Sequence, residues 1–335
     1  MAETMEKEVV IAIPKIQTPT SYNDLRPISM SSLWSKILES VVAELTLQET
    51  KKNWKENQHG GMKGSLTEHV LIEAWDEILS GLDGGNDNAA VVFTAIDFSK
   101  SFSRCGHQEI LEAYKRVGAS NWLLRMHAAF LMDRTMAVKL GITLSTPRRV
   151  TGGAVQGSVL GVMDHNVVLN DIDEGISEEC YVAKYIDDLT VIEKVKKEVR
   201  TRIDTTANRP LHTIHPEKTQ EAFNNLKKNA DKKGLKINES KTQLLSVSSA
   251  KYDTLAEINT SATSLTTSNN NLKMLGFNFS NKPNVEAQVE SLIKKANKRY
   301  FVILRHKKAG IPTNKLTEIY CSTLRSVLEL SLIHI

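Results

Sequence analysis

Two apolar stretches that end in acidic residues restrict the fold of this chain more than any other feature. The first, AAVVFTAID, is a β-branched run with the length of a buried strand, and it ends at Asp97. The second, YIDDLTV, sets Asp187 and Asp188 between two short apolar segments, as in the turn of a hairpin. A carboxylate at the end of a buried strand is costly unless a cation meets it. If both stretches lie in one sheet, three negative charges gather in a small space.

Three carboxylates gathered in this way indicate a site for hard cations. Mg²⁺ prefers a few carboxylates and keeps its other positions for water and substrate phosphate. Two such ions about 4 Å apart would activate an attacking hydroxyl and stabilise a leaving pyrophosphate. Each pattern also has an ordinary explanation, because an Asp-Asp pair is common turn chemistry and Asp97 could cap the next segment. The two stretches by themselves leave both readings open.

The distribution of charge says more than its sum. The chain has 335 residues and a formal net charge of +4, too small to argue for nucleic acid. However, residues 194–241 carry 13 Lys/Arg against 6 Asp/Glu, and residues 291–308 carry seven Lys/Arg and no acid. Two basic surfaces suggest a polyanion along particular faces, although solvated helix faces would give the same counts. No run of about 18 apolar residues occurs, so no membrane partner is expected.

Hydrophobic periodicity predicts strands alternating with helices, which is typical of an α/β or α+β chain. We expect strands over residues 9–13, 89–97, 136–140, 235–247 and 272–279, and a hairpin over 181–192. We expect helices from Ile28 and from Pro283, and over residues 65–82, 109–116, 122–130 and 216–234.

Seven sequence elements, in this order, resemble the motifs of the reverse transcriptases of non-LTR (LINE-type) retrotransposons. They are IPK followed by DLRPISM, QHGGMKGSLTEHVLIEAWD, FTAIDFSKSF, GGAVQGSVLG, YIDD, GLKINESKT and LKMLGF. Residues 285–329 are similar to the start of the family's thumb, so the resemblance covers nearly the whole chain. Three positions depart from the family pattern: Val155 and Val162 replace prolines, and Ser103 replaces an acid.

The resemblance implies an α+β right-hand polymerase with fingers, an antiparallel palm sheet backed by helices, and a partial thumb. Fingers are expected over residues 1–88, and the palm over 89–282 with part of the fingers interleaved around 120–150. The thumb would begin at 283–335. Because the terminal LELSLIHI is largely aliphatic and has no polar finish, we expect a truncated thumb in a fragment of a longer reading frame.

The resemblance also assigns catalytic roles. Asp97, Asp187 and Asp188 would hold two Mg²⁺ ions, with Mn²⁺ as a substitute. Lys241 would stand near the pyrophosphate as a candidate general acid. Phe102 would stack under the sugar and exclude a 2′-hydroxyl by its bulk.

Further residues are assigned to nucleotide binding. Lys15 and Arg26 would reach the triphosphate from the fingers, since ammonium and guanidinium groups suit phosphate oxygens. Gln156 and Gly157 would lie against the incoming nucleotide and the template, with the glycine allowing close backbone approach.

Two groups of residues are assigned to the nucleic acid. A primer grip would position the primer end: Leu275, Gly276 and Phe277. Basic residues of the thumb would follow the duplex backbone, giving binding that depends on salt rather than on sequence: Lys294, Lys298 and Arg305.

The implied function is RNA-directed DNA polymerase in retrotransposition, with an RNA template, a DNA primer or target, and deoxynucleoside triphosphates as partners. An intracellular protein is expected, synthesised in the cytoplasm and, by analogy, acting in the nucleus. Two alternatives stay open. One is an RNA-dependent RNA polymerase, which shares the palm and the metals. The other is a decayed or co-opted fragment that binds nucleic acid without activity.

Overall fold

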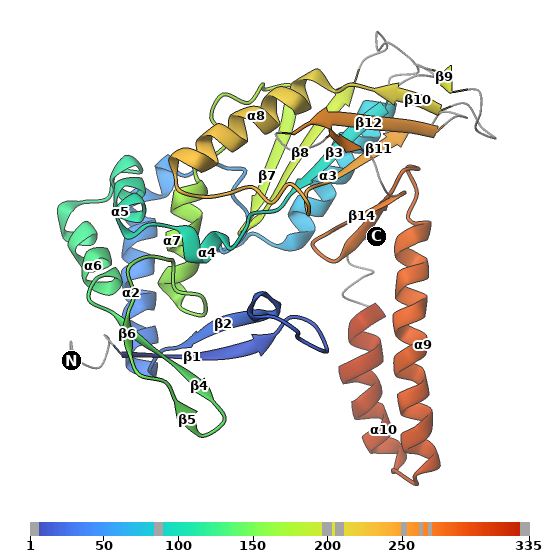
Figure 1. Ribbon diagram of the computed structural model, residues 1–335. Coiled ribbons are helices and arrows are strands. Elements are labelled where there is room, and N and C mark those ends of the chain that lie inside the picture. Colours follow the sequence, from blue (N-terminus) through green and yellow to red (C-terminus); the bar gives the residue numbers. More distant parts are fainter. Residues whose placement is uncertain are drawn as a thin grey trace.

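The computed structural model describes residues 7–83, 90–195, 203–204, 211–248, 253–260, 264–266 and 270–328. Figure 1 shows a central sheet with helices around it, a second sheet at one end, and two helices that project from the other end. The second sheet and the projecting helices extend from the same side of the central sheet. Within these residues no helix has the length and apolar character needed to cross a membrane.

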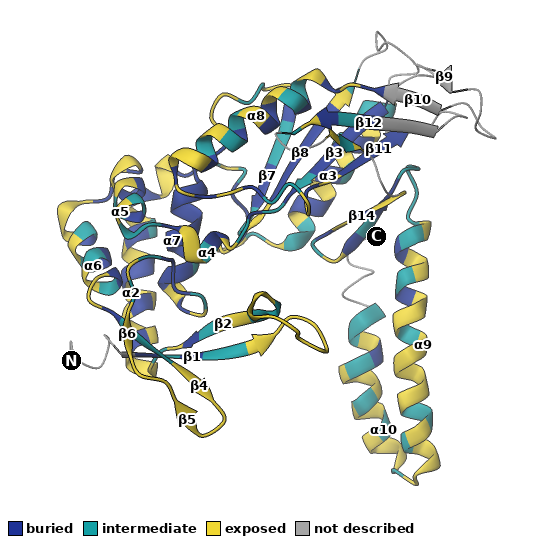
Figure 2. Ribbon diagram, viewed as in Figure 1, coloured by how far each residue is buried: buried dark blue, intermediate teal, exposed yellow. Residues whose placement is uncertain are grey.

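The central sheet is antiparallel throughout, in the order β11-β3-β8-β7. Its strands are β3 (Ala90–Ile96), β7 (Cys180–Tyr185), β8 (Asp188–Val195) and β11 (Gln243–Ser248). β3 is apolar at nearly every position because both of its faces are covered. Val91 and Phe93 pack with the apolar side chains of α3 (Thr67–Leu82), whereas Val92 and Ile96 belong to a separate cluster with α7 (Val159–Leu169) and α8 (Glu217–Lys232). Figure 2 shows β3 and β8 mostly in dark blue, which marks buried residues.

A group of helices encloses α7 at one end of the sheet (Figure 1). They are α2 (Leu33–Thr50), the short α4 (Ser101–Arg104), α5 (His107–Arg116) and α6 (Asn121–Leu131). α7 is buried along nearly its whole length, from Leu160 to Leu169 apart from Val162. Glu39 of α2 accepts a hydrogen bond from the backbone N–H of Val159 at 2.8 Å. A carboxylate at a helix N-terminus is favourable because it meets unpaired N–H groups and the positive end of the helix dipole.

The second sheet has the order β2-β1-β4-β5, with β6 paired to β4. Its strands are β1 (Lys7–Pro14), β2 (Leu25–Met30), β4 (Thr135–Leu140), β5 (Thr143–Leu144) and β6 (Arg148–Arg149). The predicted helix from Ile28 is wrong at its start. Ile28 pairs with Ile11 in the β1–β2 ladder, and α2 begins only at Leu33 after the N-cap Ser32.

The C-terminal half adds two small sheets and a pair of helices. One sheet has the order β13-β12-β10-β9: β9 (Ile203–Asp204), β10 (Leu211–Ile214), β12 (Asp253–Asn259) and β13 (Ser264–Thr266). The other is the hairpin of β14 (Asn271–Met274) and β15 (Phe277–Ser280), followed by α9 (Glu286–Lys308) and α10 (Thr313–Ile319). Single turns complete the described elements: η1 (Tyr22–Asp24), η2 (Lys51–Asn53) and η3 (Tyr320–Arg325).

Two of the extended predictions are corrected here. The single strand expected over residues 272–279 is a hairpin, because Leu275 and Gly276 adopt φ of 48° and 89° and reverse the chain. Positive φ at both central residues is the geometry of a type I′ turn. Of the extended segment expected over 235–247, only the part from Gln243 onward forms a strand.

Helix α3 bears on the predicted domain limits. It lies within residues 1–88, the predicted fingers, yet Val70, Leu71, Ala74 and Ile78 are buried against the central sheet. A boundary drawn by packing would therefore fall before Thr67.

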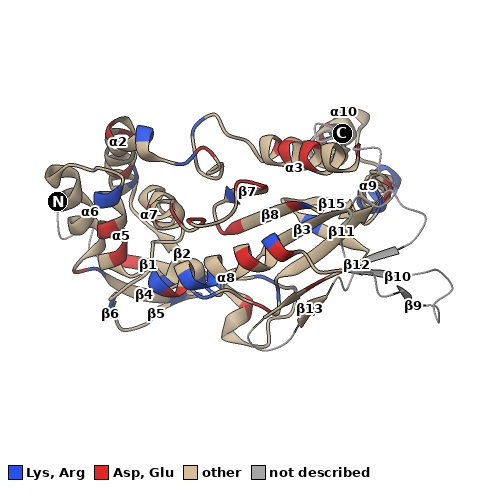
Figure 3. Ribbon diagram, turned by 90° about the horizontal axis from the view of Figure 1, so that it is seen from above, with Lys and Arg blue, Asp and Glu red and all other residues tan. Residues whose placement is uncertain are grey.

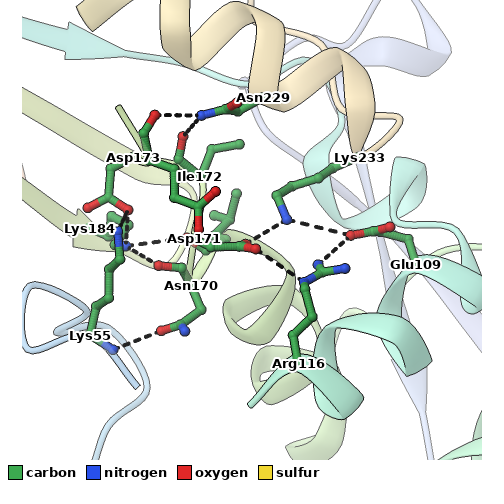
Figure 4. Close-up of polar contacts among 12 residues, drawn as sticks. Lys55, Glu109, Arg116, Asn170, Asp171, Ile172, Asp173, Lys184, Asn229 and Lys233 are labelled. Atoms are coloured by element: carbon green, nitrogen blue, oxygen red, sulfur yellow. Dashed lines mark hydrogen bonds and ion pairs between the residues drawn. The ribbon is translucent and has the colours of Figure 1, made fainter. Parts of the chain in front are cut away.

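A network of ion pairs joins the loop after α7 to its neighbours (Figure 4). Two acids of this loop, Asp171 and Asp173, form its centre. Their basic partners come from four parts of the chain: Lys55 before α3, Lys184 of β7, Arg116 of α5 and Lys233 just after α8. The loop thus links β7 of the central sheet to α5, to the end of α8 and to the segment before α3.

Lys184 is the most deeply buried charge in this network, with an exposure of 0%. Its Nζ donates to the carbonyl oxygens of Leu169 and Asn170, at 3.3 and 2.8 Å, and to Oδ1 of Asp173 at 3.0 Å. Burial lowers the pKa of Lys184 to about 8, while the charge of Asp173 opposes that effect. Burial also resists ionisation of Asp173, but the charge of Lys184 and hydrogen bonds from Lys55 and Asn57 outweigh it and lower the pKa of this carboxyl.

Removal of the counter-ion should destabilise the protein strongly. Asp173→Asn leaves Lys184 buried without an opposite charge beside it, so we expect the free energy of unfolding to fall by about 3–5 kcal/mol. Adding Lys184→Met to Asp173→Asn should recover part of this loss, because no buried charge then remains in the pair. Urea denaturation measures both changes.

The matched control is a surface ion pair. Lys315 and Glu318 lie 2.9 Å apart on α10 and are both well exposed. Glu318→Gln should change stability by no more than about 1 kcal/mol, because exposed pairs are hydrated and screened. An Asp173→Asn loss as small as that of Glu318→Gln would contradict the structural role of the buried pair.

Candidate active site

A cavity of about 590 Å³ opens between three parts of the chain. They are the antiparallel pair of β1 and β2 with its connecting loop, here called the β1–β2 arm, the end of β3, and the β7–β8 turn. Seven residues predicted from the sequence line it: Lys15, Arg26, Asp97, Phe102, Gln156, Asp187 and Lys241. A smaller adjoining cavity of about 140 Å³ is lined by Asp97, Asp188 and Lys241 among others. The structure therefore brings together residues that lie far apart in the sequence.

Asp97 follows the last residue of β3, and its backbone is held by a later motif. The N–H of Asn238 donates to the carbonyl oxygen of Asp97 at 2.7 Å, and Phe98 forms an isolated antiparallel bridge with Ile237. This pairing fastens the GLKINESKT segment to the strand end. As a consequence Lys241 lines both cavities beside Asp97.

The turn between β7 and β8 carries the other two acids. Tyr185 pairs with Asp188, which leaves Ile186 and Asp187 as the two turn residues. Ile186 has a φ of 57°, a left-handed conformation that is strained for a β-branched side chain. Such strain persists only where surrounding structure enforces it.

The surrounding structure is the QHGG motif, which lies along the open edge of β7. The N–H of Lys184 donates to the carbonyl oxygen of Asn57 at 2.9 Å, and the N–H of His59 donates to that of Lys184 at 2.8 Å. Gly60 lies directly beneath the turn, since a Cβ there would be 2.4 Å from the backbone nitrogen of Ile186. The backbone of this motif thus fixes the position of the turn that carries Asp187 and Asp188.

The three carboxylates influence one another electrostatically. Asp187 and Asp188 remain accessible to solvent at the turn, yet the surrounding cavity walls partly bury their carboxylates and limit their hydration. This burial, followed by the charges of Asp187 and Asp97, raises the pKa of Asp188 to about 6. Burial and the charge of Asp97 also raise the pKa of Asp187, and Arg26 opposes that rise.

This donor set suits a hard divalent cation, although the ligands are not assembled in advance. The side chains offer carboxylate oxygens, which Mg²⁺ prefers, and a bound cation would offset the burial and the repulsion that raise the pKa values of Asp187 and Asp188. Across the described ranges, no three His, Cys, Asp or Glu side chains are close enough together to hold a metal ion as they stand. Asp97 lines both cavities, whereas Asp187 lines the larger one and Asp188 the smaller one.

The residues assigned to the triphosphate lie on the opposite wall of the cavity. Arg26 is exposed on β2, and Lys15 is exposed after β1, where its Nζ donates to the carbonyl oxygen of Asn23 at 2.9 Å. Lys15 therefore also fastens the loop that connects β1 to β2.

Gly157 is required by a contact inside the protein. Its φ is 107°, and a Cβ there would lie 2.9 Å from the carbonyl oxygen of Ser29 in β2. The N–H of Ser29 also donates to the carbonyl oxygen of Gln156 at 2.8 Å. The close backbone approach expected at this glycine is thus an approach to β2.

The primer-grip residues separate into two kinds. Leu275 and Gly276 form the tip of the β14–β15 hairpin, where Gly276 is exposed and Leu275 half-buried. Phe277 is instead fully buried, with its ring centroid 6.0 Å from that of Trp75 in a perpendicular arrangement. The side chain of Phe277 therefore supports the hairpin from the core, and its part in positioning the primer end stays a prediction.

The basic residues predicted on the last long helix are exposed on α9. Lys294 and Lys298 line a cavity of about 370 Å³ between this helix and the β14–β15 hairpin, and Arg305 lies two turns beyond Lys298. Lys294 is 3.7 Å from Glu290 one turn away, a weak exposed pair. Figure 3 shows basic positions on α8 and α9.

Two further lysines line these cavities, and the sequence segments that contain them do not indicate their roles. Lys273 lines the smaller cavity with Asp97 and Asp188, and Lys295 lines the one beside α9. Alternation along β14, where Leu272 and Met274 are buried and Lys273 is exposed, would have indicated its direction only if the strand had been placed correctly.

An antiparallel palm sheet whose strand ends and hairpin turn present acids to one cavity, beside a projecting basic helix, is the architecture of a right-hand polymerase. A family model described as "Reverse transcriptase (RNA-dependent DNA polymerase)" matches residues 13–279. The chain belongs to the reverse transcriptase family. The predicted fold class, an α+β right-hand polymerase, is confirmed.

Relatives named for mobile elements support the predicted LINE-type resemblance. The chain is similar to the "RNA-directed DNA polymerase from mobile element jockey" of Drosophila melanogaster, 26% identical over 189 residues, which are 54% of this chain and 20% of that protein. It is 26% identical over 184 residues to the "Probable RNA-directed DNA polymerase from transposon BS" of the same organism, covering 52% of this chain and 20% of that one. The chain spans about a fifth of the length of these curated relatives.

Solved structures of telomerase share the fold. Telomerase from Candida tropicalis in complex with the TWJ fragment of telomeric RNA superimposes with a TM-score of 0.57 and 12% identity, covering 98% of this chain and 53% of that one. The apo telomerase truncated from its C-terminal domain gives a TM-score of 0.53 over 82% of this chain and 53% of that one, at 12% identity.

A side chain at position 60 should displace the acidic turn. In Gly60→Ala the added Cβ meets the backbone of Ile186, so we expect a loss of about 1–3 kcal/mol in stability. Hydrogen exchange should also become faster at the amides of residues 186–189. Gly106→Ala is the matched control because a Cβ there meets no atom within 4 Å. Equal effects of the two variants would contradict the role of Gly60 in fixing the β7–β8 turn.

The raised pKa of Asp188 predicts a pH-dependent effect of Asp188→Asn in metal-free buffer. The folded protein holds the proton of Asp188 up to about pH 6, whereas the unfolded chain releases it near its usual pKa of 3.8. Ionised Asp188 therefore destabilises the fold at pH 7 to 8, and Asp188→Asn should be more stable than the parent there. Below about pH 4 both states are protonated and the difference should vanish. Thermal unfolding across this range measures it, and a difference that does not change with pH would contradict the electrostatic origin.

Proposed function

We propose that this chain is an RNA-directed DNA polymerase that extends the 3′-hydroxyl of a primer with deoxynucleotides. The observation that carries the proposal is the single cavity lined by Asp97, Asp187, Arg26, Phe102 and Lys241 in a chain of the reverse transcriptase family. Basic and acidic side chains on opposite walls suit a triphosphate that reacts beside a divalent cation.

Asp97, Asp187 and Asp188 would hold divalent ions, with Mg²⁺ as the expected species and Mn²⁺ as a substitute. Bound there, two such ions supply positive charge that offsets the charge developing on the reacting phosphate and lower the pKa of the attacking hydroxyl. The carboxylate oxygens of the three residues, and the pKa values of Asp187 and Asp188 that burial and neighbouring charge raise, support this assignment.

The other cavity residues bind and orient the nucleotide. Arg26 and Lys15 offer N–H donors to phosphate oxygens from the β1–β2 arm, and Gln156 lies between that arm and α7. Lys241, next to Asp97, would deliver a proton to the departing pyrophosphate. Phe102 would restrict space near the sugar, so that deoxynucleotides are preferred.

The nucleic acid would lie between the hairpin tip and α9. Leu275 and Gly276 would contact the primer end, while Lys294, Lys298 and Arg305 would neutralise backbone phosphates. An RNA template and a DNA primer or target are the partners proposed. Affinity should fall steeply with salt, since each neutralised phosphate releases counter-ions.

Within this proposal, residues 1–88 contain the fingers together with α3, which packs on the palm sheet. Residues 89–282 serve as palm with fingers interleaved around 120–150, and 283–335 as the start of a thumb. The similarity to mobile-element proteins supports a role in retrotransposition. Such a protein would be synthesised in the cytoplasm and would act on chromosomal DNA in the nucleus.

Primer extension on an RNA template, with and without divalent metal, tests the proposal. The parent should incorporate deoxynucleotides only with metal, and Asp187→Asn should reduce incorporation at least a thousandfold while duplex binding changes little. Asp76→Asn, at an exposed acid of α3, is the matched control and should keep parental activity.

Each alternative has its own outcome in this assay. Extension by Asp187→Asn at the parental rate would show that the centre is misassigned. Preferential use of ribonucleotides would indicate an RNA-dependent RNA polymerase. Binding of duplex by the soluble parent without extension would indicate a fragment that has lost activity.

A further inference from the structure

Phe102 is held in the cavity wall by the segment that leads into α7. Its carbonyl oxygen accepts a hydrogen bond from the N–H of Ala154 at 2.7 Å. Gly153 lies so close that a Cβ there would be 3.4 Å from the same carbonyl oxygen. The backbone of Phe102 is thus fixed, and its side chain is half-buried.

One face of the Phe102 ring is covered by His165. The two ring centroids are 4.3 Å apart and the planes differ by only 7°, so the rings are stacked. His165 lies within α7 and has no exposed surface. Because α7 is enclosed by other helices, His165 cannot move back to let the phenyl ring withdraw from the cavity.

The imidazole ring of His165 makes this contact in its neutral form and, among the described residues, without hydrogen bonds. In the described part of the chain, neither ring nitrogen has a hydrogen-bond partner. Burial lowers its pKa to about 3, so the imidazole is uncharged at neutral pH. A buried polar ring without partners costs stability, so its polar atoms bring no gain to the fold. What the ring does provide is a flat surface behind Phe102.

We propose that His165 is a positioning residue that sets how strictly Phe102 discriminates deoxynucleotides from ribonucleotides. The inference rests on the proposed function, and it adds a residue that does not itself line the cavity. A side chain excludes a 2′-hydroxyl by bulk only while it keeps its place. The stacked imidazole prevents Phe102 from rotating or retreating when a larger sugar enters.

Two substitutions separate stacking from packing. His165→Leu keeps a side chain of similar volume but removes the ring, whereas His165→Phe keeps a ring and removes the unpaired nitrogens. The measured quantity is the ratio of kcat/KM for a deoxynucleotide to kcat/KM for the matching ribonucleotide. We expect the ratio to fall roughly two- to tenfold in His165→Leu, the size of an aromatic pair contribution. It should stay near the parental value in His165→Phe.

The kinetic constants identify the origin of the change. In His165→Leu the KM for the ribonucleotide should fall while kcat for the deoxynucleotide stays within about twofold of the parent. A generally damaged fold would lower kcat for both substrates together and leave the ratio unchanged. Val168→Ala, a truncation of a fully buried side chain in the same helix, is the matched control and should keep the parental ratio.

A double-mutant cycle tests whether His165 acts through Phe102. Phe102→Ala alone should admit ribonucleotides, and adding His165→Leu to it should change the ratio no further. An equal loss in the presence and absence of Phe102 would overturn the inference, as would an unchanged ratio in an active His165→Leu. A loss in His165→Phe as large as in His165→Leu would also overturn it. If the parent incorporated no nucleotide at all, the proposed function itself would fail, and the inference with it.

Discussion

The arrangement depends on the ladder between β3 and β8. Because Ile96 pairs with Leu189, the chain leaves one strand at Asp97 beside the point where Asp188 enters the other. Burial and neighbouring like charges both oppose ionised carboxylates here, as the raised pKa of Asp188 shows, so backbone contacts must hold them in place. Asn238 holds one side and the QHGG segment holds the other. These backbone contacts hold Asp97, Asp187 and Asp188 in positions that burial and mutual repulsion disfavour.

The parts that sequence reasoning predicted are those in which pattern and environment agree. The run before Asp97 is apolar on both faces because α3 and α8 cover both faces, so its length and composition were sufficient. The order of motifs likewise indicated which acids would meet. The predictions failed where a contact across the chain decides the local conformation. Ile28 continues a strand because β1 lies beside it, and Leu275 turns because a hairpin closes there.

Other residues escaped prediction because their role is visible only in three dimensions. Gly60 looks like an ordinary loop glycine until Ile186 is seen above it, and Lys184 looks like a strand lysine until Asp173 is seen behind it. Phe277, assigned to the primer, faces Trp75 in the core. His165 gives no hint in the sequence that it stacks on Phe102. Each case is a pair of residues distant in sequence, and single-sequence periodicity holds no information about such pairs.

The pairing of β3 with β8 and β11 affects how the protein can fold while it is being synthesised. β3 leaves the ribosome first but lies between two strands that are synthesised much later, so its edges stay unpaired while roughly a hundred further residues emerge. Non-local pairing of this kind closes slowly, because loop entropy must be overcome before the ladder forms. A nascent chain stalled before Gln243 would present an apolar, open-edged sheet. Until β11 is made, the free edge of β3 could pair with the strand of another chain instead.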